Sequence, residues 1–189
     1  MSFKEKVNMA DSSDATVVRG AGQSEVTSIT GFYHVECHDK DGNLKWADDI
    51  HNLVTTIGKN KTMDTILGNT AGGAIVMGLK GTGTAAVGDT QASHAGWTEV
   101  GLANAPTYTA PRKTPAFSAA SAGAKATSSA VVFSMTGSGT VAGCFINIGG
   151  ATTIDDTTGT LFSAGDFTAG SKTVTSGDSL SVTYTATAA

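Results

Sequence analysis

Two histidines and a glutamate alternate along the stretch HVECHD and are the residues best placed to do chemistry. His34, Glu36 and His38 lie two positions apart, so on a β-strand their side chains would share one face. Such a trio could converge on a metal ion and serve a metal-dependent hydrolase. A metal site also needs further ligands fixed nearby, and the sequence supplies no second cluster. We therefore expect no metal and no cofactor, and interpret this face as solvated or inter-subunit.

Carboxylates and cysteines are the other candidates for catalysis. Two pairs of adjacent carboxylates, Asp48-Asp49 and Asp155-Asp156, could in principle serve a glycosidase. Neighbours in sequence rarely point at one substrate, so N-capping and loop solvation explain both pairs better. Cys37 and Cys144 lie far apart in the chain, and no Gly-rich elbow or oxyanion motif accompanies them, so we interpret both as buried thiols. The sequence therefore predicts no catalytic residue and no enzyme.

The histidine stretch belongs to a predicted β-hairpin, ITGFYHVECHDKDGNLKWADD. Asp41-Gly42 is a common two-residue hairpin turn, and it would place Lys40 opposite Asn43 and Cys37 opposite Trp46. Period-two alternation puts a second set of side chains on the face opposite the histidines. This set, which we expect to face the core, is Tyr33, Val35 and Cys37.

One helix is expected, in the stretch TTIGKNKTMDTILGN. Thr55 or Thr56 can cap its start, and Gly68-Asn69 ends it. Three apolar residues fall at the helical spacing i, i+3 and i+4 and form its expected apolar face. They are Met63, Ile66 and Leu67. A single short helix in a strand-rich chain indicates a helix packed on the end or flank of a sheet.

The remaining segments have the pattern of short strands separated by turns. SAVVFSM alternates, whereas VAGCFINIGG is a continuous apolar run typical of a central strand. The two runs of SKTVTSGDSLSVTY are predicted to form a hairpin at Gly177-Asp178. All three prolines fall within residues 101–129, which should be irregular or edge structure because proline cannot donate to a central ladder.

About eight or nine such strands, with turns every 8–12 residues, predict an all-β fold. We expect a β-sandwich or jelly-roll-like domain over residues 29–189 with one short helix, because the helical runs that a parallel α/β fold requires do not occur. Residues 1–28 are polar and lack periodicity, so alone they should be flexible. They could be a disordered tail or an arm that orders against a neighbour.

Charge and composition argue against several classes of function. The formal net charge is −4, the pI is near 5.4 and charged residues make up 15% of the chain, so nothing electrostatic favours nucleic acid. Gly, Thr, Ser and Ala fill the deficit of charge, which suits strands and tight turns. The N-terminal residues contain neither a signal-peptide core nor an apolar span of membrane length. We expect synthesis in the cytoplasm and no membrane contact.

Three stretches together resemble a family of small structural proteins of tailed bacteriophages. They are GFYHVECHDKDGNLKWADDIHNLVTTIG, GDTQASHAGWTEV and GTLFSAGDFTAGSKTVTSGDSLSVTYTATAA. The resemblance covers roughly residues 30–189 and includes no catalytic motif. It implies a capsid decoration (cement) protein: a β-rich oligomer, with a trimer favoured, that sits on the capsid exterior of the virion and stabilises the head. The major capsid protein and further copies of the chain would then be its partners.

In that role, residues 1–28 would clasp the capsid and order only at assembly. The contact residues expected in this arm are Val17, Val18 and Arg19. Trp97, in SHAGWTEVG, could be an exposed anchor for a partner or a sugar, since Trp is enriched at binding hot spots; core packing at a strand start is the alternative.

Other functions remain open at this point. A tail, fibre or neck component, or a sugar-binding receptor module, would need exposed aromatics around a groove. Trp97, Tyr108 and Trp46 are the candidates for stacking on a sugar.

Overall fold

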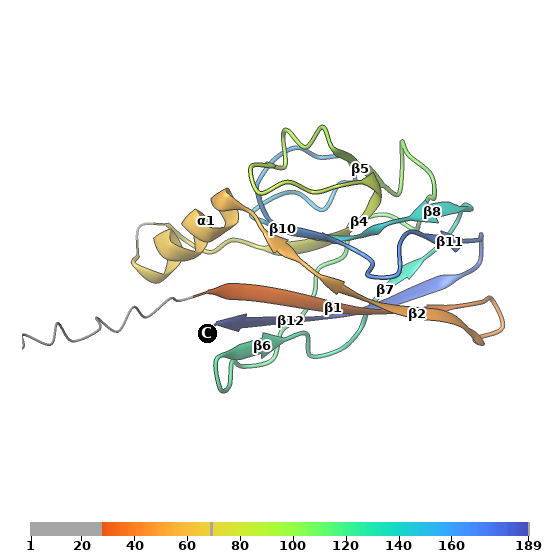
Figure 1. Ribbon diagram of the computed structural model, residues 1–189, viewed down its shortest axis with the longest axis horizontal. Helices are drawn as coiled ribbons and strands as arrows, with labels where there is room; N and C mark the ends of the chain where they lie inside the picture. Colours follow the sequence, from red (N-terminus) through yellow and green to blue (C-terminus); the bar gives the residue numbers. More distant parts are fainter. Residues whose placement is uncertain (1–27, 69, 189) are drawn as a thin grey trace, which may run out of the picture.

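Two antiparallel sheets face each other in the computed structural model, which describes residues 28–68 and 70–188 (Figure 1). The first sheet runs in the order β2-β1-β12, and two short strands both pair with β12. Its strands are β1 (Ile29–His38), β2 (Leu44–His51), β6 (Ala124–Ala126), β7 (Val131–Ser134) and β12 (Ser179–Ala188). The all-β sandwich expected from the spacing of strands and turns is confirmed.

The second sheet runs in the order β3-β10-β9-β4-β5. Its strands are β3 (Leu53–Val54), β4 (Ile75–Gly83), β5 (Trp97–Val100), β9 (Gly143–Ile148) and β10 (Thr160–Asp166). The apolar run in β9 lies between two partners, as expected for a central strand. A separate two-stranded sheet is formed by β8 (Gly139–Val141) and β11 (Lys172–Val174).

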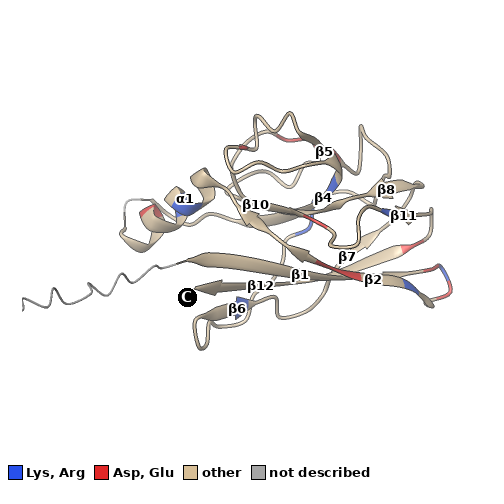
Figure 2. Cartoon of the chain, viewed as in Figure 1, with Lys and Arg blue, Asp and Glu red and all other residues tan. Residues whose placement is uncertain are grey.

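The core fills the space between the two large sheets. Period-two alternation along β1, β7 and β12 turns one row of side chains inward, and the predicted inward face of β1 is confirmed. The first sheet contributes Tyr33, Val35, Cys37, Val131, Phe133, Leu180, Val182 and Tyr184. Opposite them lie Met77, Leu79, Cys144, Ile146 and Phe162 of the second sheet. Charged residues are sparse over both sheets (Figure 2).

The first hairpin turns through three residues rather than the predicted two. Asp39 N donates to Asn43 O at 2.9 Å and Gly42 N donates to Asp39 O at 3.0 Å. Gly42 has φ +85°, so a tight turn followed by a left-handed glycine closes the loop, as in hairpins with a bulge. The predicted pairing of Lys40 with Asn43 is therefore wrong. The register shifts between positions 37 and 38, and the predicted pairing of Cys37 with Trp46 is kept.

The helix α1 (Thr56–Ile66) begins and ends where expected. Thr55 is its N-cap, and the hydroxyl of Thr55 accepts from Gly58 N at 3.0 Å. The expected apolar face is not buried, however. The exposed fractions are 54% for Met63, 70% for Ile66 and 75% for Leu67. The helix rests on β10 through its first turn instead, where the buried Gly58 lies against the backbone of Phe162.

The two runs near the C-terminus do not pair with each other, so the predicted hairpin over residues 171–184 is wrong. β11 pairs with β8, whereas β12 pairs with β1, β6 and β7. The turn between them is held by Asp178, whose carboxylate accepts from Thr175 N at 2.8 Å and from Lys45 Nζ at 2.5 Å. These hydrogen bonds fix the turn through which the chain passes from β11, in the two-stranded sheet, to β12, in the first sheet.

The proline-containing segment is irregular, as expected. Between β5 and β7 only β6 and isolated bridges form regular pairs. Within the described ranges, no helix has the length and apolar character that a membrane span requires.

Candidate functional site

Only one of the predicted contact residues lies in the described part of the chain. Val17, Val18 and Arg19 fall outside the described residues. Trp97 is the first residue of β5 and only 3% exposed. Its ring stacks on His94 with centroids 4.0 Å apart and packs against Phe145 at 5.5 Å. The interpretation of Trp97 as an exposed anchor is therefore wrong, and the core alternative is confirmed.

The other two aromatic candidates also serve packing. Tyr108 is buried and meets Phe133 edge to face at 5.0 Å. Trp46 is half-buried, and its Nε1 donates to Thr173 O at 3.2 Å. Both residues hold neighbouring strands together, and neither offers an open face like that of a sugar-stacking platform.

The histidine face of β1 is an ion-pair row on the outside of the sandwich. His34 Nδ1 lies 2.7 Å from Asp49 Oδ1, and Glu36 bridges His34 and His38 at 3.6 and 3.7 Å. The hydrogen bond to Asp49 raises the pKa of His34 above its ordinary value. Among the described residues, no three His, Cys, Asp or Glu side chains are placed to hold a metal ion. Charge pairing across the strands accounts for this face.

The first carboxylate pair lies within β2, so the prediction of N-capping is wrong for it. The side chains of Asp48 and Asp49 point to different partners, as neighbours on a strand do. Asp48 pairs with Lys172 at 2.8 Å and accepts from Thr168 Oγ1 at 2.9 Å, whereas Asp49 pairs with His34. The pair therefore links β2 to two different segments.

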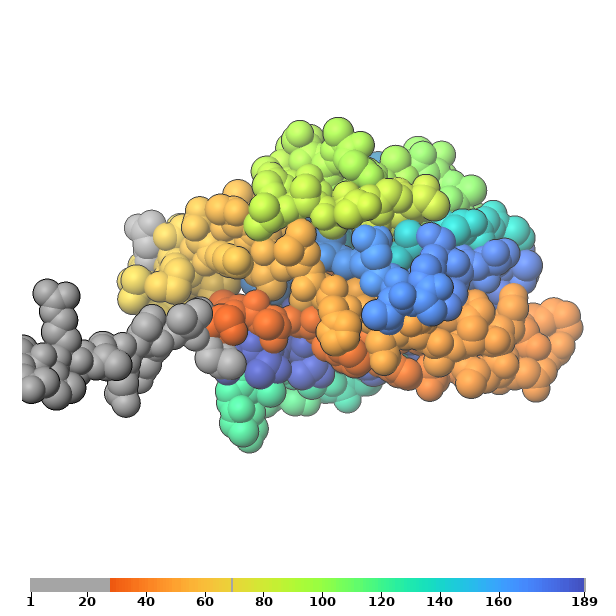
Figure 3. All heavy atoms as spheres, viewed as in Figure 1, coloured from red at the N-terminus to blue at the C-terminus, as the bar shows by residue number. Residues whose placement is uncertain are grey.

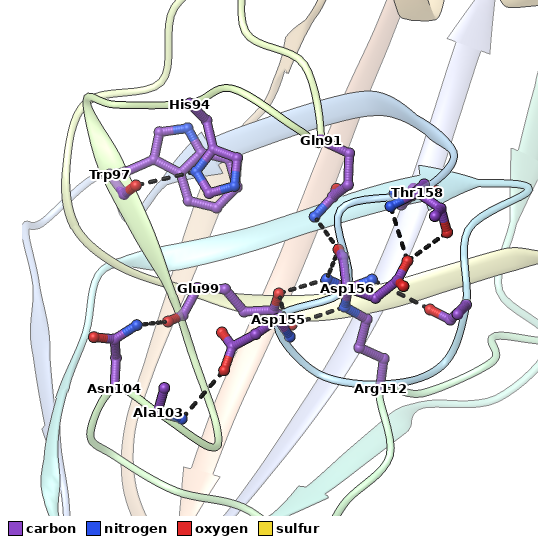
Figure 4. Close-up of polar contacts among 12 residues, drawn as sticks. Gln91, His94, Trp97, Glu99, Ala103, Asn104, Arg112, Asp155, Asp156 and Thr158 are labelled. Atoms are coloured by element: carbon purple, nitrogen blue, oxygen red, sulfur yellow. Dashed lines mark hydrogen bonds and ion pairs between the residues drawn. The ribbon is translucent and has the colours of Figure 1, made fainter.

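The second carboxylate pair borders a cavity of about 430 Å³ at the edge of the second sheet (Figure 4). One wall is the loop before β5, the floor is β5 itself, and the other wall is the loop between β9 and β10. The lining residues include Gln91, Ala92, His94, Ala95, Trp97, Glu99, Asn104, Asp155 and Asp156. The segment from Gln91 through β5 thus meets the distant loop between β9 and β10 at one place, which we take as the candidate site.

A buried ion pair holds the floor of the cavity to its wall. Arg112 Nε and Nη2 donate to the two carboxylate oxygens of Glu99 at 2.8 and 2.6 Å. Arg112 Nη2 also donates to Asp156 O at 2.7 Å, and Nη1 donates to Ala151 O at 3.2 Å. Burial raises the pKa of Glu99, although the guanidinium opposes this shift. The bidentate geometry fixes the position of the loop that carries the aspartates.

The loop between β9 and β10 presents its two aspartates differently. Asp155 has φ +66°, a left-handed conformation that Asp tolerates better than most residues. Its backbone N–H donates to Glu99 Oε2 at 3.1 Å, and its Oδ2 accepts from Ala103 N at 3.2 Å. The carboxylate of Asp156 instead accepts from Thr158 N at 2.9 Å. The prediction of a loop role for this pair is confirmed.

The two thiols are buried and free, as predicted. Burial raises the pKa of Cys37 to about 11 and that of Cys144 to about 12. A thiol with a raised pKa is a poor nucleophile at neutral pH. Both residues therefore belong to the core.

Sequence reasoning missed the residues that build the cavity. Arg112 lies in the proline-containing segment, where no periodic pattern indicates a buried side chain. Glu99 is a charged residue buried on the face of β5 opposite Val100, away from the core between the sheets. Gln91 carries no sequence signal at all. The sequence drew attention to this region only through Trp97 and the Asp155-Asp156 pair. The assembled site can hold a small polar molecule by hydrogen bonds between its walls.

No protein-family model, curated protein or solved structure matches this chain.

Proposed function

We propose that this chain is a non-enzymatic structural protein of a tailed-phage particle, a decoration protein that binds the outer face of the head. It acts as a homo-oligomer, with a trimer favoured, and the major capsid protein is its other partner. It is made in the host cytoplasm and ends on the capsid exterior. This role requires no nucleic acid, membrane or cofactor.

The exposed apolar face of α1 is the observation that carries this proposal. Met63, Ile66 and Leu67 are spaced so that they share one side of the helix, and each is more than half exposed. Large apolar side chains gathered on a surface mark sites of protein interaction. We assign this face to contact with a capsid subunit, because many weak contacts suffice when an oligomer engages a shell of repeated sites.

The position of α1 supports the same assignment. Asn52 N, just before the helix, donates to Gly31 O at the start of β1 at 3.1 Å. The start of β1 and the helix therefore lie at one end of the sandwich (Figures 1 and 3). An N-terminal arm that clasps the capsid would join the domain at the same end as α1, so both could contact one shell surface.

The use of buried charge gives further support. The four buried charged residues of the described chain all have ionic partners, in the pairs Glu99–Arg112, Lys80–Asp166 and Asp178–Lys45. Each pair joins segments distant in sequence, so these groups stiffen the sandwich. An enzyme instead poises such groups near the operating pH for transfer of protons.

Sedimentation with heads that lack this protein tests the proposal. The triple variant M63S/I66S/L67S should lose at least about tenfold in head binding and keep its melting temperature, because exposed side chains contribute little to stability. The matched control is L44S/V132S, which removes two other exposed apolar side chains and should bind like the original chain. Equal binding by both variants would contradict the assignment of α1.

Removal of residues 2–27 addresses the arm separately. The shortened chain should bind heads more weakly while its sandwich still folds, because the two sheets and their core lie within the described residues. Unchanged binding would refute the role of the arm. The role of α1 is tested separately by the triple variant.

A second candidate function is a tail, fibre or neck component that binds receptor sugars. The cavity beside β5 is the specific observation that favours it. The copy number per particle separates the two locations, since a head decoration protein is present in hundreds of copies.

A further inference from the structure

An unpaired acceptor is buried at the cavity described above. Gln91 is only 2% exposed, and its Nε2 donates to Asp156 O at 3.3 Å. This bond fixes the orientation of the amide, because the oxygen cannot face another carbonyl oxygen. Gln91 Oε1 is buried and has no hydrogen-bond partner within the described residues. A buried polar atom without a partner is costly and indicates that something outside the chain satisfies it.

Two further groups at the cavity are acceptors as well. His94 Nδ1 lies 3.1 Å from the carbonyl oxygen of Trp97, which can only accept, so Nδ1 carries the proton. Nε2 of the neutral imidazole is then an acceptor. Asp155 uses only Oδ2 in the hydrogen bonds of the described chain, so its other oxygen can accept from a ligand. A molecule bound here must therefore be rich in hydrogen-bond donors.

The net charge of the cavity lining is modestly negative. The carboxylate of Glu99 is neutralised by Arg112, and only the two aspartates of the wall remain without a cationic partner in the described chain (Figure 4). Hydroxyl donors to a carboxylate form short, charge-assisted hydrogen bonds. An anionic ligand would be repelled.

Size and wall chemistry distinguish between the donor-rich ligands. The cavity volume of about 430 Å³ falls in the range of sites for small molecules and far exceeds the space that one ammonium group needs. Ala92, Ala95 and the His94–Trp97 stack supply apolar walls beside the acceptors. A pyranose ring has the matching character, since it carries C–H faces and a rim of hydroxyl donors.

We propose that this cavity binds a neutral sugar ring, with Gln91 Oε1, Asp155 and His94 accepting from its hydroxyl groups. This inference deepens the second candidate function, on which it rests for its biological setting. Its test differs from that of the particle location, because sugar binding is measured on the isolated chain. The two measurements are independent. The chain could be located on the head and still bind a sugar, or be located on the tail and bind none, and each result would be recognised.

The experiment uses the full chain, first on a glycan array and then by saturation-transfer NMR with methyl glycosides of glucose, galactose, mannose and N-acetylglucosamine. Ala92→Trp fills the cavity from an exposed position and should abolish the sugar signal. Ala169→Trp is the matched control, since Ala169 is exposed in a turn outside the cavity lining, and it should bind like the original chain. Gln91→Met should keep the volume of the side chain and weaken binding at least about tenfold, because it removes the proposed hydrogen bond to the sugar and the bond from Nε2 to Asp156 O.

The melting temperature of each variant shows whether it is folded, so a loss of binding can be assigned to the site.

n-Butylamine is used in the same NMR experiment to test whether the cavity binds an ammonium group instead of a sugar. No sugar signal on the array or by NMR, or an equal signal in Ala92→Trp, would overturn the proposal. So would binding of n-butylamine alone with a loss at high salt, which would assign the cavity to ammonium groups.

Discussion

Replacing Arg112 with methionine removes the cation at the centre of the most deeply buried ion pair. The side chain of Arg112 has no solvent exposure, and that of its partner Glu99 is 3% exposed. The substitution keeps much of the apolar stem but deletes two hydrogen bonds to Glu99. It also deletes the bonds to the carbonyl oxygens of Asp156 and Ala151.

The expected loss of stability follows from the carboxylate left behind. Breaking a buried ion pair by removing one partner costs about 3–5 kcal/mol, because the other charge stays buried without compensation. For a domain of this size, about 1 kcal/mol corresponds to about 2–4 °C in melting temperature. Arg112→Met should therefore lower the melting temperature by about 6–20 °C.

The loss should also depend on pH. Burial already raises the pKa of Glu99 against the opposing effect of Arg112, so the pKa rises further when the cation is gone. The folded variant then holds a proton that the unfolded chain releases. Its stability is greatest below the ordinary pKa of glutamate and is lost as the pH rises through the raised value. The deficit relative to the original chain should be larger at pH 8 than at pH 5.

Thermal and urea unfolding of the full chain at both pH values measure this prediction. The double variant Glu99→Leu/Arg112→Met provides the control, because replacing both charges by apolar groups should recover much of the loss. A loss below about 1 kcal/mol, far under the range for a broken buried pair, would refute the reasoning. So would an equal loss at both pH values, or a double variant no more stable than the single one.

Three further predictions concern packing, thiols and surface charge. Gly58→Ala should destabilise the chain by about 1–3 kcal/mol, because a Cβ there would overlap a backbone carbonyl of β10, although alanine normally favours helices. Cys37 and Cys144, whose pKa values burial raises to about 11 and about 12, should react slowly with a disulfide reagent at pH 8 and rapidly after unfolding. NMR titration should give His34 a pKa above its ordinary value, and Asp49→Asn should lower that pKa by removing the hydrogen bond that raises it.

Controls and contrary results are available for each of the three. Gly88→Ala should be neutral, because a Cβ at Gly88 meets nothing within 4 Å; a gain in stability from Gly58→Ala would mean that α1 does not rest on β10. Rapid reaction of either thiol in the folded chain would show that the core is open. The raised pKa of His34 adds stability that is present at acid pH and lost as the pH rises through that pKa. An unchanged His34 titration in Asp49→Asn would exclude their pairing.

Local patterns predicted the helix boundaries and the inward face of β1, because alternation and capping act over a few residues. The described chain has twelve strands rather than the eight or nine expected, since several are only two to four residues long and carry little pattern. The inward face of β1 follows from period two alone, and Thr55 caps the helix by its own hydroxyl. The hairpin loop shows the limit of such reasoning. Asp39 accepts from the backbone N–H of Asp41 and Asn43 at 2.9 and 2.8 Å, and these bonds favour the longer turn.

Long-range pairing could not be read from the sequence. SKTVTS and SLSVTY have the alternation of a hairpin, but nothing within them shows that β11 pairs with β8 instead. The apolar spacing of Met63, Ile66 and Leu67 correctly indicates a helix. Their exposure could not be predicted, because the helix contacts the sheet through the buried Gly58 of its first turn instead.

The candidate site was the least predictable part, because its members meet only after folding. Gln91, Glu99 and Arg112 lie in three different segments, and no spacing relates them. The buried pair between Glu99 and Arg112 also runs against the general expectation that charged residues are exposed. Trp97 and the Asp155-Asp156 pair were visible in the sequence as candidates, but nothing in the sequence showed that they border one cavity.

A cryo-EM map of the purified phage particle, with the copy number measured by quantitative mass spectrometry, tests the central proposal most directly. We expect density for the sandwich on the outer face of the head in hundreds of copies, with the α1 end against the major capsid protein. Absence of the chain from purified particles, or density confined to a few copies on the tail, would contradict a head decoration protein.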